Sequence, residues 1–150
     1  MRALAFALAA IVLVADRVTT SVAEDHLHGI THVWGPFGLA LGFNTGFAFS
    51  LFSGRATLVT VLLCLGVVVL CLVVARVRTP PQAIGGGLIL GGAAGNISER
   101  LVSGHHGQVA DFITLTHWAT FNLADACITV GVVVVAASVL FGRGPEPAAT

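Results

Sequence analysis

Residues 56–75 read ATLVTVLLCLGVVVLCLVVA, an unbroken apolar run of twenty residues without a charged side chain. A helix needs about twenty such residues to cross the hydrocarbon core of a bilayer, which is about 30 Å thick. The whole chain shares this character, since 56% of its 150 residues are hydrophobic and only 9% are charged. A soluble domain carries about 25% charged residues, so we expect lipid to be the solvent for much of this surface.

Three further segments continue the apolar pattern. Residues 123–141 are interrupted only by Asp125, and residues 83–97 are short and rich in glycine. The first apolar run meets Asp16 after only about 20 Å of helix, so the helix must continue past it to cross the bilayer. The sequence therefore predicts a single membrane domain over residues 1–150 that is all-α within the membrane, with four transmembrane helices at about residues 3–20, 56–77, 83–98 and 122–141.

The first segment also has features of a cleaved signal peptide. It carries Arg2, a short apolar run and the small residues Ser21-Val22-Ala23, which resemble a cleavage site. Of the two interpretations, we expect a helix that is retained.

The arginines predict which way the helices face. Arg2, Arg76, Arg78 and Arg143 flank the predicted spans on one side, and cytoplasmic segments of membrane proteins are enriched in such residues. Both termini are therefore expected in the cytoplasm, with residues 19–55 and 99–120 outside.

Two local patterns add detail to this frame. Apolar side chains alternate at Phe43, Phe47, Phe49 and Leu51, which is the period of a strand and predicts a small sheet resting on the outer membrane surface. In the third span, glycines recur at residues 87, 91 and 95, so we expect another helix to approach that face closely.

The charge balance and the cysteines exclude other classes. Net charge is zero, with seven arginines, no lysine and no basic block, so nucleic acid is not an expected partner. Cys64, Cys71 and Cys127 all lie in apolar stretches, which favours packing roles over a disulfide framework or a zinc site.

Polar residues at membrane depth are costly and usually mark function. Asp16, Asn96, Arg100 and Asp125 all fall at the outer ends of predicted spans, and Asp111 is expected in the loop that joins the last two. A single site at the outer mouth of the helix bundle is the economical interpretation.

Asp111 and Asp125 are suited to act as a general acid and base. Two carboxylates held close together share one proton, so that one can activate water while the other donates to a carbonyl. Asn122 can cap the fourth helix, which places Asp125 where the helix dipole favours an anion, so Asp111 would hold the shared proton more often. The alternative is that Asp125 merely completes a capping box with Asn122, and the residues alone leave both interpretations open.

At these positions the sequence resembles the bacterial lipoprotein signal peptidases, the signal peptidase II family. The resemblance covers five blocks in the family's order: Asp16, residues 44–50 (NTGFAFS), residues 91–100 (GGAAGNISER), residues 109–113 (VADFI) and residues 121–128 (FNLADACI).

The resemblance implies an aspartic endopeptidase of the plasma membrane, with its site near the outer surface. It would remove signal peptides from diacylglyceryl-modified prolipoproteins by cutting before the lipidated cysteine, without a metal or cofactor. A small sheet would cradle the substrate, a loop or helix would cover it as a lid, and phospholipid would surround a monomer. By position, the catalytic pair is Asp111 and Asp125, and the polar residues lining the substrate site are Asp16, Asn44, Asn96, Arg100 and Asn122.

The chain departs from the family's pattern at four positions. Arg17 stands where glutamine is usual, Thr20 replaces a lysine, Glu99 an aspartate and Cys127 a serine. None of these changes removes the aspartate pair, but they leave room for a diverged paralogue.

Some residues of the chain are also consistent with other functions. One alternative is a small transporter, since intramembrane acids can relay protons, although here the acids gather at one surface. Another is a cysteine enzyme that uses Cys127 with His117, but Cys127 lies within an apolar helix and is poorly placed as a nucleophile. Metal handling is a further alternative, because ligand types cluster in the outer segments at Glu24, Asp25, His26, His28, His32, His105 and His106.

Overall fold

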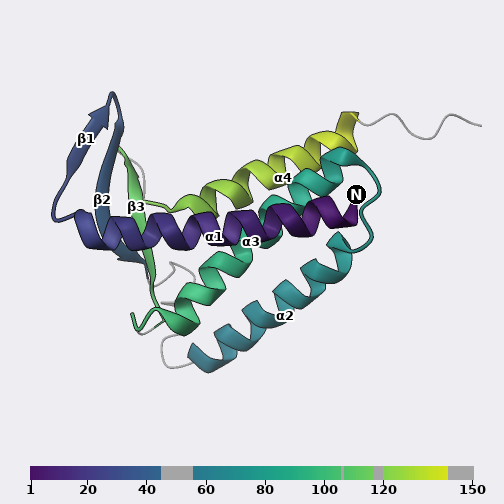
Figure 1. Ribbon diagram of the computed structural model, residues 1–150, viewed down its shortest axis with the longest axis horizontal. Helices are drawn as coiled ribbons and strands as arrows, with labels where there is room; N and C mark the ends of the chain where they lie inside the picture. Colours follow the sequence, from purple (N-terminus) through teal and green to yellow (C-terminus); the bar gives the residue numbers. More distant parts are fainter. Residues whose placement is uncertain (45–55, 106, 117–119, 142–150) are drawn as a thin grey trace, which may run out of the picture.

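The computed structural model describes residues 1–44, 56–105, 107–116 and 120–141, with side chains in the second helix described from residue 61 onward. Its helices form a bundle, and a small sheet lies across one end of it (Figure 1). In chain order the elements are α1 (Arg2–His26), β1 (Thr31–Trp34), β2 (Phe37–Asn44), α2 (Ala56–Val74), α3 (Pro80–Val102), β3 (Val109–Leu115) and α4 (Leu123–Phe141).

The helices overlap the predicted spans: α1 and α3 extend beyond theirs, whereas α2 ends at Val74, before the predicted residue 77. α1 does not end near residue 20, as expected, but continues to His26. The reason is its buried stripe, which repeats every three or four residues and carries on through Thr20 and Ala23. By length and composition, α1 and α4 are the described helices able to cross a membrane, and Val61–Val74 is a shorter apolar helix.

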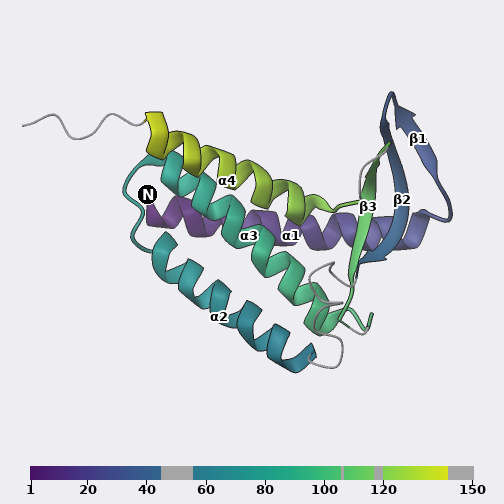
Figure 2. The same cartoon turned by 180° about the vertical axis from the view of Figure 1, so that it is seen from behind.

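Glycines place α3 at the centre of the bundle, in contact with α1, α2 and α4 (Figure 2). A Cβ atom on Gly91 would lie 2.6 Å from the Val12 Cβ and 2.7 Å from the Ala9 carbonyl oxygen of α1. A Cβ atom on Gly92 would lie 2.5 Å from the Ala124 carbonyl oxygen of α4. The predicted close approach on the face of Gly87, Gly91 and Gly95 is therefore confirmed, and α1 is the helix that makes it.

The three strands form an antiparallel sheet in the order β1-β2-β3. Its β2–β3 register places Gly42 opposite Asp111 and Asn44 opposite Val109. The expectation that Asp111 lies in a loop is wrong, because the Val109–Leu115 segment is buried and pairs its backbone with β2. The predicted strand pattern begins within β2, whereas Phe47, Phe49 and Leu51 lie outside the described residues.

Candidate active site

The sheet end of the bundle brings together all seven polar residues singled out in the sequence. There, the last turns of α3 and the first turn of α4 lie next to β3 (Figure 1). Two hydrogen-bonded centres, one at each aspartate, are joined by an asparagine relay.

Asp111 lies in the middle of β3 and is 1% exposed. Its Oδ2 accepts a hydrogen bond from Asn44 Nδ2 at 2.9 Å, and its buried Oδ1 has no hydrogen-bond partner among the described residues. Burial raises the pKa of the Asp111 carboxyl to about 6, and the charges of Asp125 and Glu99 add to this rise. The hydrogen bond from Asn44 and the positive charge of Arg100 oppose the rise in pKa. A proton is therefore held on Asp111 at a pH where an ordinary aspartate has lost it.

Asp125 lies in the first turn of α4, and Asn122 caps that helix. The Asn122 Oδ1 accepts the Asp125 backbone N–H at 2.9 Å, which confirms the predicted cap. A complete capping box would also turn the Asp125 carboxylate back to the Asn122 backbone. Instead, in the described part of the chain, Asp125 Oδ1 accepts a hydrogen bond from Asn96 Nδ2 of α3 at 2.8 Å. The carboxylate thus points across the helix interface.

The relay between the two aspartates consists of two asparagines. Asn122 Nδ2 donates to Asn96 Oδ1 at 3.1 Å and lies 3.5 Å from the carbonyl oxygen of Ala110, the residue before Asp111. Asn122 is fully buried, so its amide group has little freedom to exchange these partners for water. The orientation of Asp125 is thereby coupled to the strand that carries Asp111.

Asp16 and Arg100 complete the predicted set. The Asp16 Oδ1 accepts the Ala124 backbone N–H at 2.9 Å, and the side chain is fully buried against Gly95. Asp16 of α1 therefore holds the first turn of α4 in place through this buried hydrogen bond. Arg100 is half-buried and donates through Nη1 to the Asn96 carbonyl oxygen at 3.1 Å.

Glu99 is an important residue that the sequence presented only as a departure from a motif. Its side chain is fully buried, and its Oε1 accepts the Ala110 backbone N–H at 2.6 Å. The Arg17 Nη1 lies 3.9 Å from the other oxygen, Oε2. An acid next to Arg100 was visible in the sequence, but its contact with β3 depends on how the chain folds back after α3.

A groove of about 340 Å³ opens beside the polar site, between α2, α3 and α4. Apolar side chains such as Leu62, Val67 and Ile128 line most of it, and Asn96 and Arg100 lie along it. An apolar groove with a few polar groups along it suits a ligand that has a hydrocarbon part and a polar part.

The fold is that of a bacterial membrane enzyme. A bacterial membrane enzyme determined at 2.3 Å by the in meso method superposes with a TM-score of 0.80 at 21% identity, covering 97% of this chain and 93% of the other. A second such structure, at 1.9 Å, also gives a TM-score of 0.80, at 22% identity, covering 93% of this chain and 94% of the other.

Sequence comparisons define the family more closely. The model of the family described as signal peptidase (SPase) II matches residues 8–141. A lipoprotein signal peptidase of Rhodococcus jostii is 35% identical, covering 97% of this chain and 76% of the relative. Another, from Francisella tularensis subsp. novicida, is 36% identical and covers 92% of each chain. The chain therefore belongs to the signal peptidase II family, as the motifs predicted, and it is a membrane protease.

Proposed function

We propose that Asp111 and Asp125 are the catalytic pair of this signal peptidase II, which removes signal peptides from prolipoproteins. The observation that carries the proposal is the relay from Asp125 through Asn96 and Asn122 to the backbone beside Asp111. Such a network fixes two carboxyl groups relative to each other, as an acid and base acting on one bond require. The raised pKa of Asp111 supports the same interpretation, because perturbed carboxyl groups cluster at catalytic sites.

The pair would cut the peptide bond with one shared proton. The ionised carboxylate removes a proton from water as the water oxygen attacks the scissile carbonyl carbon, and the protonated carboxyl donates to the carbonyl oxygen. As the tetrahedral intermediate collapses, the leaving nitrogen takes the proton removed from water, and one hydroxyl of the intermediate returns its proton to the carboxylate that had donated it, so that the pair again holds one proton. Because burial raises the pKa of Asp111, we assign Asp111 as the proton donor and Asp125 as the base.

The remaining polar residues would orient the pair and the substrate. Asn44 and Asn96 each donate to one aspartate, and Asn122 links them. Arg100 is suited to the polar part of the substrate, since it lines the apolar groove. Asp16, behind Ala124, would act by holding the first turn of α4 in place.

The groove is suited to a lipidated substrate. We assign it to an acyl chain or an apolar stretch of signal peptide on a prolipoprotein, with cleavage before the diacylglyceryl-modified cysteine. Phospholipid would surround a monomeric enzyme, and the reaction would need neither a metal nor a cofactor, since two carboxyl groups suffice to activate water.

The proposed topology has four spans with both termini in the cytoplasm, in a single domain of the bacterial plasma membrane. Large apolar side chains are exposed along the helices, as expected for lipid contact, and examples are Ile11, Val14, Val68, Val69 and Val133. The N-terminus and the end of α4 lie at the opposite end of the bundle from the sheet (Figure 1). Arg2, Arg76 and Arg78 lie at or next to helix ends there, which supports a cytoplasmic location for that end and an outer location for the site.

The direct test is a gel-shift cleavage assay with the purified enzyme in lipid–detergent micelles. A diacylglyceryl-modified prolipoprotein should be cut, whereas the same prolipoprotein without its lipid should be cut far more slowly. Cleavage should persist in excess chelator. Loss of cleavage in chelator by an enzyme whose unfolding midpoint shows that it stays folded, with recovery on adding zinc, would mean that a metal activates the water and would refute the two-aspartate mechanism.

A further inference from the structure

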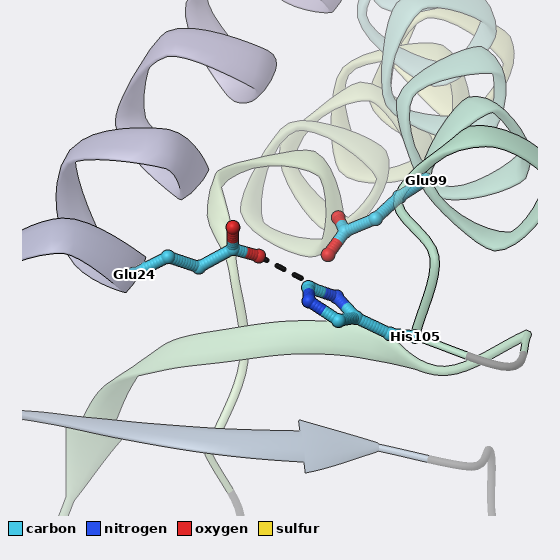
Figure 3. A group of neighbouring side chains, drawn as sticks. All are labelled: Glu24, Glu99 and His105. Carbon is cyan, nitrogen blue, oxygen red and sulfur yellow. Dashed lines mark ion pairs between the residues drawn. The ribbon is translucent and has the colours of Figure 1, made fainter.

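Three potential metal ligands converge at the sheet end of the bundle from three separate segments. Glu24 comes from the last turns of α1, Glu99 from the last turn of α3, and His105 from the connection between α3 and β3. One ligand atom from each lies within 4.8 Å of the other two, and the side chains point toward one another (Figure 3). The sequence had grouped Glu24 with nearby histidines, but His28 and His32 are exposed on the surface and His26 bonds its own helix, while His106 lies outside the described residues.

The converging atoms are buried and lack ordinary partners. Glu24 Oε1, Glu99 Oε2 and His105 Nδ1 have no hydrogen-bond partner among the described residues. The shortest approach between charged groups here is 3.6 Å, from His105 Nδ1 to Glu24 Oε1, which is too long for a hydrogen bond. Buried polar atoms are rarely left without a partner, because each costs about 1–3 kcal/mol. A ligand that bonds all three atoms at once would remove this cost.

Glu99 gives the cluster a fixed element. Its side chain is fully buried, and its Oε1 is held by the Ala110 backbone N–H, so Oε2 is directed into the cluster. Glu24 and His105 are 31% and 28% exposed, which leaves them room to rotate. The Phe43 and His105 rings also pack in an edge-to-face arrangement, with centroids 4.6 Å apart.

We propose that Glu24, Glu99 and His105 bind a divalent transition-metal ion, with Zn²⁺ the best match to the ligand atoms. Imidazole nitrogen and carboxylate oxygen are both ligands that Zn²⁺ accepts, and three protein ligands leave the fourth position of a tetrahedral site to water. Bonds of about 2.0–2.2 Å require ligand atoms roughly 3.4 Å apart, so the two partly exposed side chains must close by about 1 Å. Two carboxylates would neutralise the ion, and the bound ion would tie the outer ends of α1 and α3 to the segment that leads into β3. The cluster shares no residue with the aspartate pair, although Glu99 also bonds Ala110 beside Asp111, and the metal proposal does not depend on the proposed mechanism.

Arg17 is the neighbouring group that opposes a metal ion. Its Nη1 lies 3.9 Å from Glu99 Oε2, and a guanidinium at that distance repels a second cation. Because the Arg17 side chain is 38% exposed, it can withdraw into the surrounding water. Replacing it by glutamine should therefore tighten metal binding, by roughly tenfold. If Glu99 served only as the ion-pair partner of Arg17, the same substitution would give no gain in affinity.

The test uses the full chain in micelles, without a histidine tag, stripped by chelator and then titrated with ZnCl₂ or CoCl₂. We expect one ion per chain by calorimetry, a visible d–d absorption of a four-coordinate site with Co²⁺, and a rise of the unfolding midpoint by about 5 °C with Zn²⁺. Glu24→Gln and His105→Ala should each weaken binding at least about tenfold. The matched controls Asp25→Asn and His28→Ala, at exposed positions outside the cluster, should bind like the parent.

Three results would overturn the proposal. One is the absence of a stoichiometric Zn²⁺ or Co²⁺ signal in both the parent and the Arg17→Gln variant. Another is binding that survives Glu24→Gln and His105→Ala but is lost in His28→Ala, which would place the ion on the surface histidines. A preference for Mg²⁺ or Ca²⁺ over Zn²⁺ would also contradict it, because those ions favour all-oxygen ligands.

Discussion

The side-chain amide of Asn96 donates a hydrogen bond to the carboxylate of Asp125 at 2.8 Å, across the interface between α3 and α4. This interface is close because Gly92 leaves room for the backbone of Ala124. The position of the proposed base is therefore set by helix packing as well as by its own helix.

Replacing Asn96 by alanine should slow cleavage by roughly 10- to 100-fold, because a hydrogen bond to a charged group is worth about 1.5–3 kcal/mol. Asn122 would also lose its partner, so Asp125 would be free to turn away. The measurement is kcat for a lipidated prolipoprotein. Ser98→Ala is the matched control on the same helix, since its hydroxyl bonds only the Gly95 carbonyl oxygen in the described structure. Equal rates for the two variants would show that the Asn96 contact does not position the base.

Replacing Gly91 by alanine should destabilise the fold by roughly 1–3 kcal/mol, as overpacking does in tight interiors. The added Cβ would lie 2.6 Å from the Val12 Cβ, so α1 must shift away from α3. Gly66→Ala on α2 is the matched control, because a Cβ there meets nothing within 4 Å. It should be neutral or stabilising by up to about 1 kcal/mol. Unfolding in mixed micelles measures both, and equal midpoints would contradict the packing described for α3.

The raised pKa of Asp111 predicts how stability depends on pH. Because its pKa in the fold, about 6, lies above the ordinary value of 3.8, the folded state binds more protons than the unfolded state between these values. The contribution of Asp111 to stability is therefore greatest at low pH and falls as the pH rises from about 4 to 6. Asp111→Asn should remove this dependence and become the more stable protein above pH 6, by on the order of 2 kcal/mol. If the free energies of unfolding of the two proteins changed with pH in parallel, the conclusion that Asp111 is buried and protonated would be contradicted.

Reporter fusions test the topology. Green fluorescent protein fused after Pro81 or after Thr150, which is outside the described residues, should fluoresce in the cytoplasm. Alkaline phosphatase inserted at His28 should be active outside it. The reason is that Arg76 and Arg78 mark the α2–α3 connection as cytoplasmic. An active phosphatase at Thr150 would mean an odd number of spans.

Apolar length and glycine spacing were enough to predict the helices and the close contact of α3. Both signals are local: residues 56–75 are recognised by their apolar length, and Gly91 by the steric access that it gives to a neighbouring helix. α1 continues past the predicted span through the polar residue Thr20, which lies on its buried stripe. The Thr20 side chain is only 2% exposed because other elements of the fold cover it, and the residue type alone does not predict this burial.

β3 was missed because its residues do not alternate. Val109 through Phe112 are all buried, so the period of two that reveals a strand is absent there. For the site, sequence motifs found both aspartates and their asparagines. The sequence did not predict the contacts of Glu99 with Ala110 or of His105 with Glu24, because these residues become neighbours only when α1, α3 and β3 meet.

The catalytic assignment itself is tested by Asp111→Asn and Asp125→Asn. Asparagine keeps the shape of the side chain but cannot take a proton from water or share one across the pair. General acid–base catalysis contributes about 10²- to 10⁴-fold, so each variant should lose cleavage by at least that factor. Asp25→Asn, at an exposed position near the end of α1, is the control and should cleave normally. Retained binding of the lipidated substrate would show that the variants are folded.

The single most direct measurement is the cleavage rate of Asp125→Asn on a diacylglyceryl-modified prolipoprotein, taken beside its unfolding midpoint. If Asp125 served only the helix cap, asparagine would cost about 1 kcal/mol of stability and leave cleavage largely intact. The catalytic pair predicts the opposite, a folded protein that binds substrate and does not cut it. A near-normal cleavage rate for Asp125→Asn would contradict the proposed mechanism.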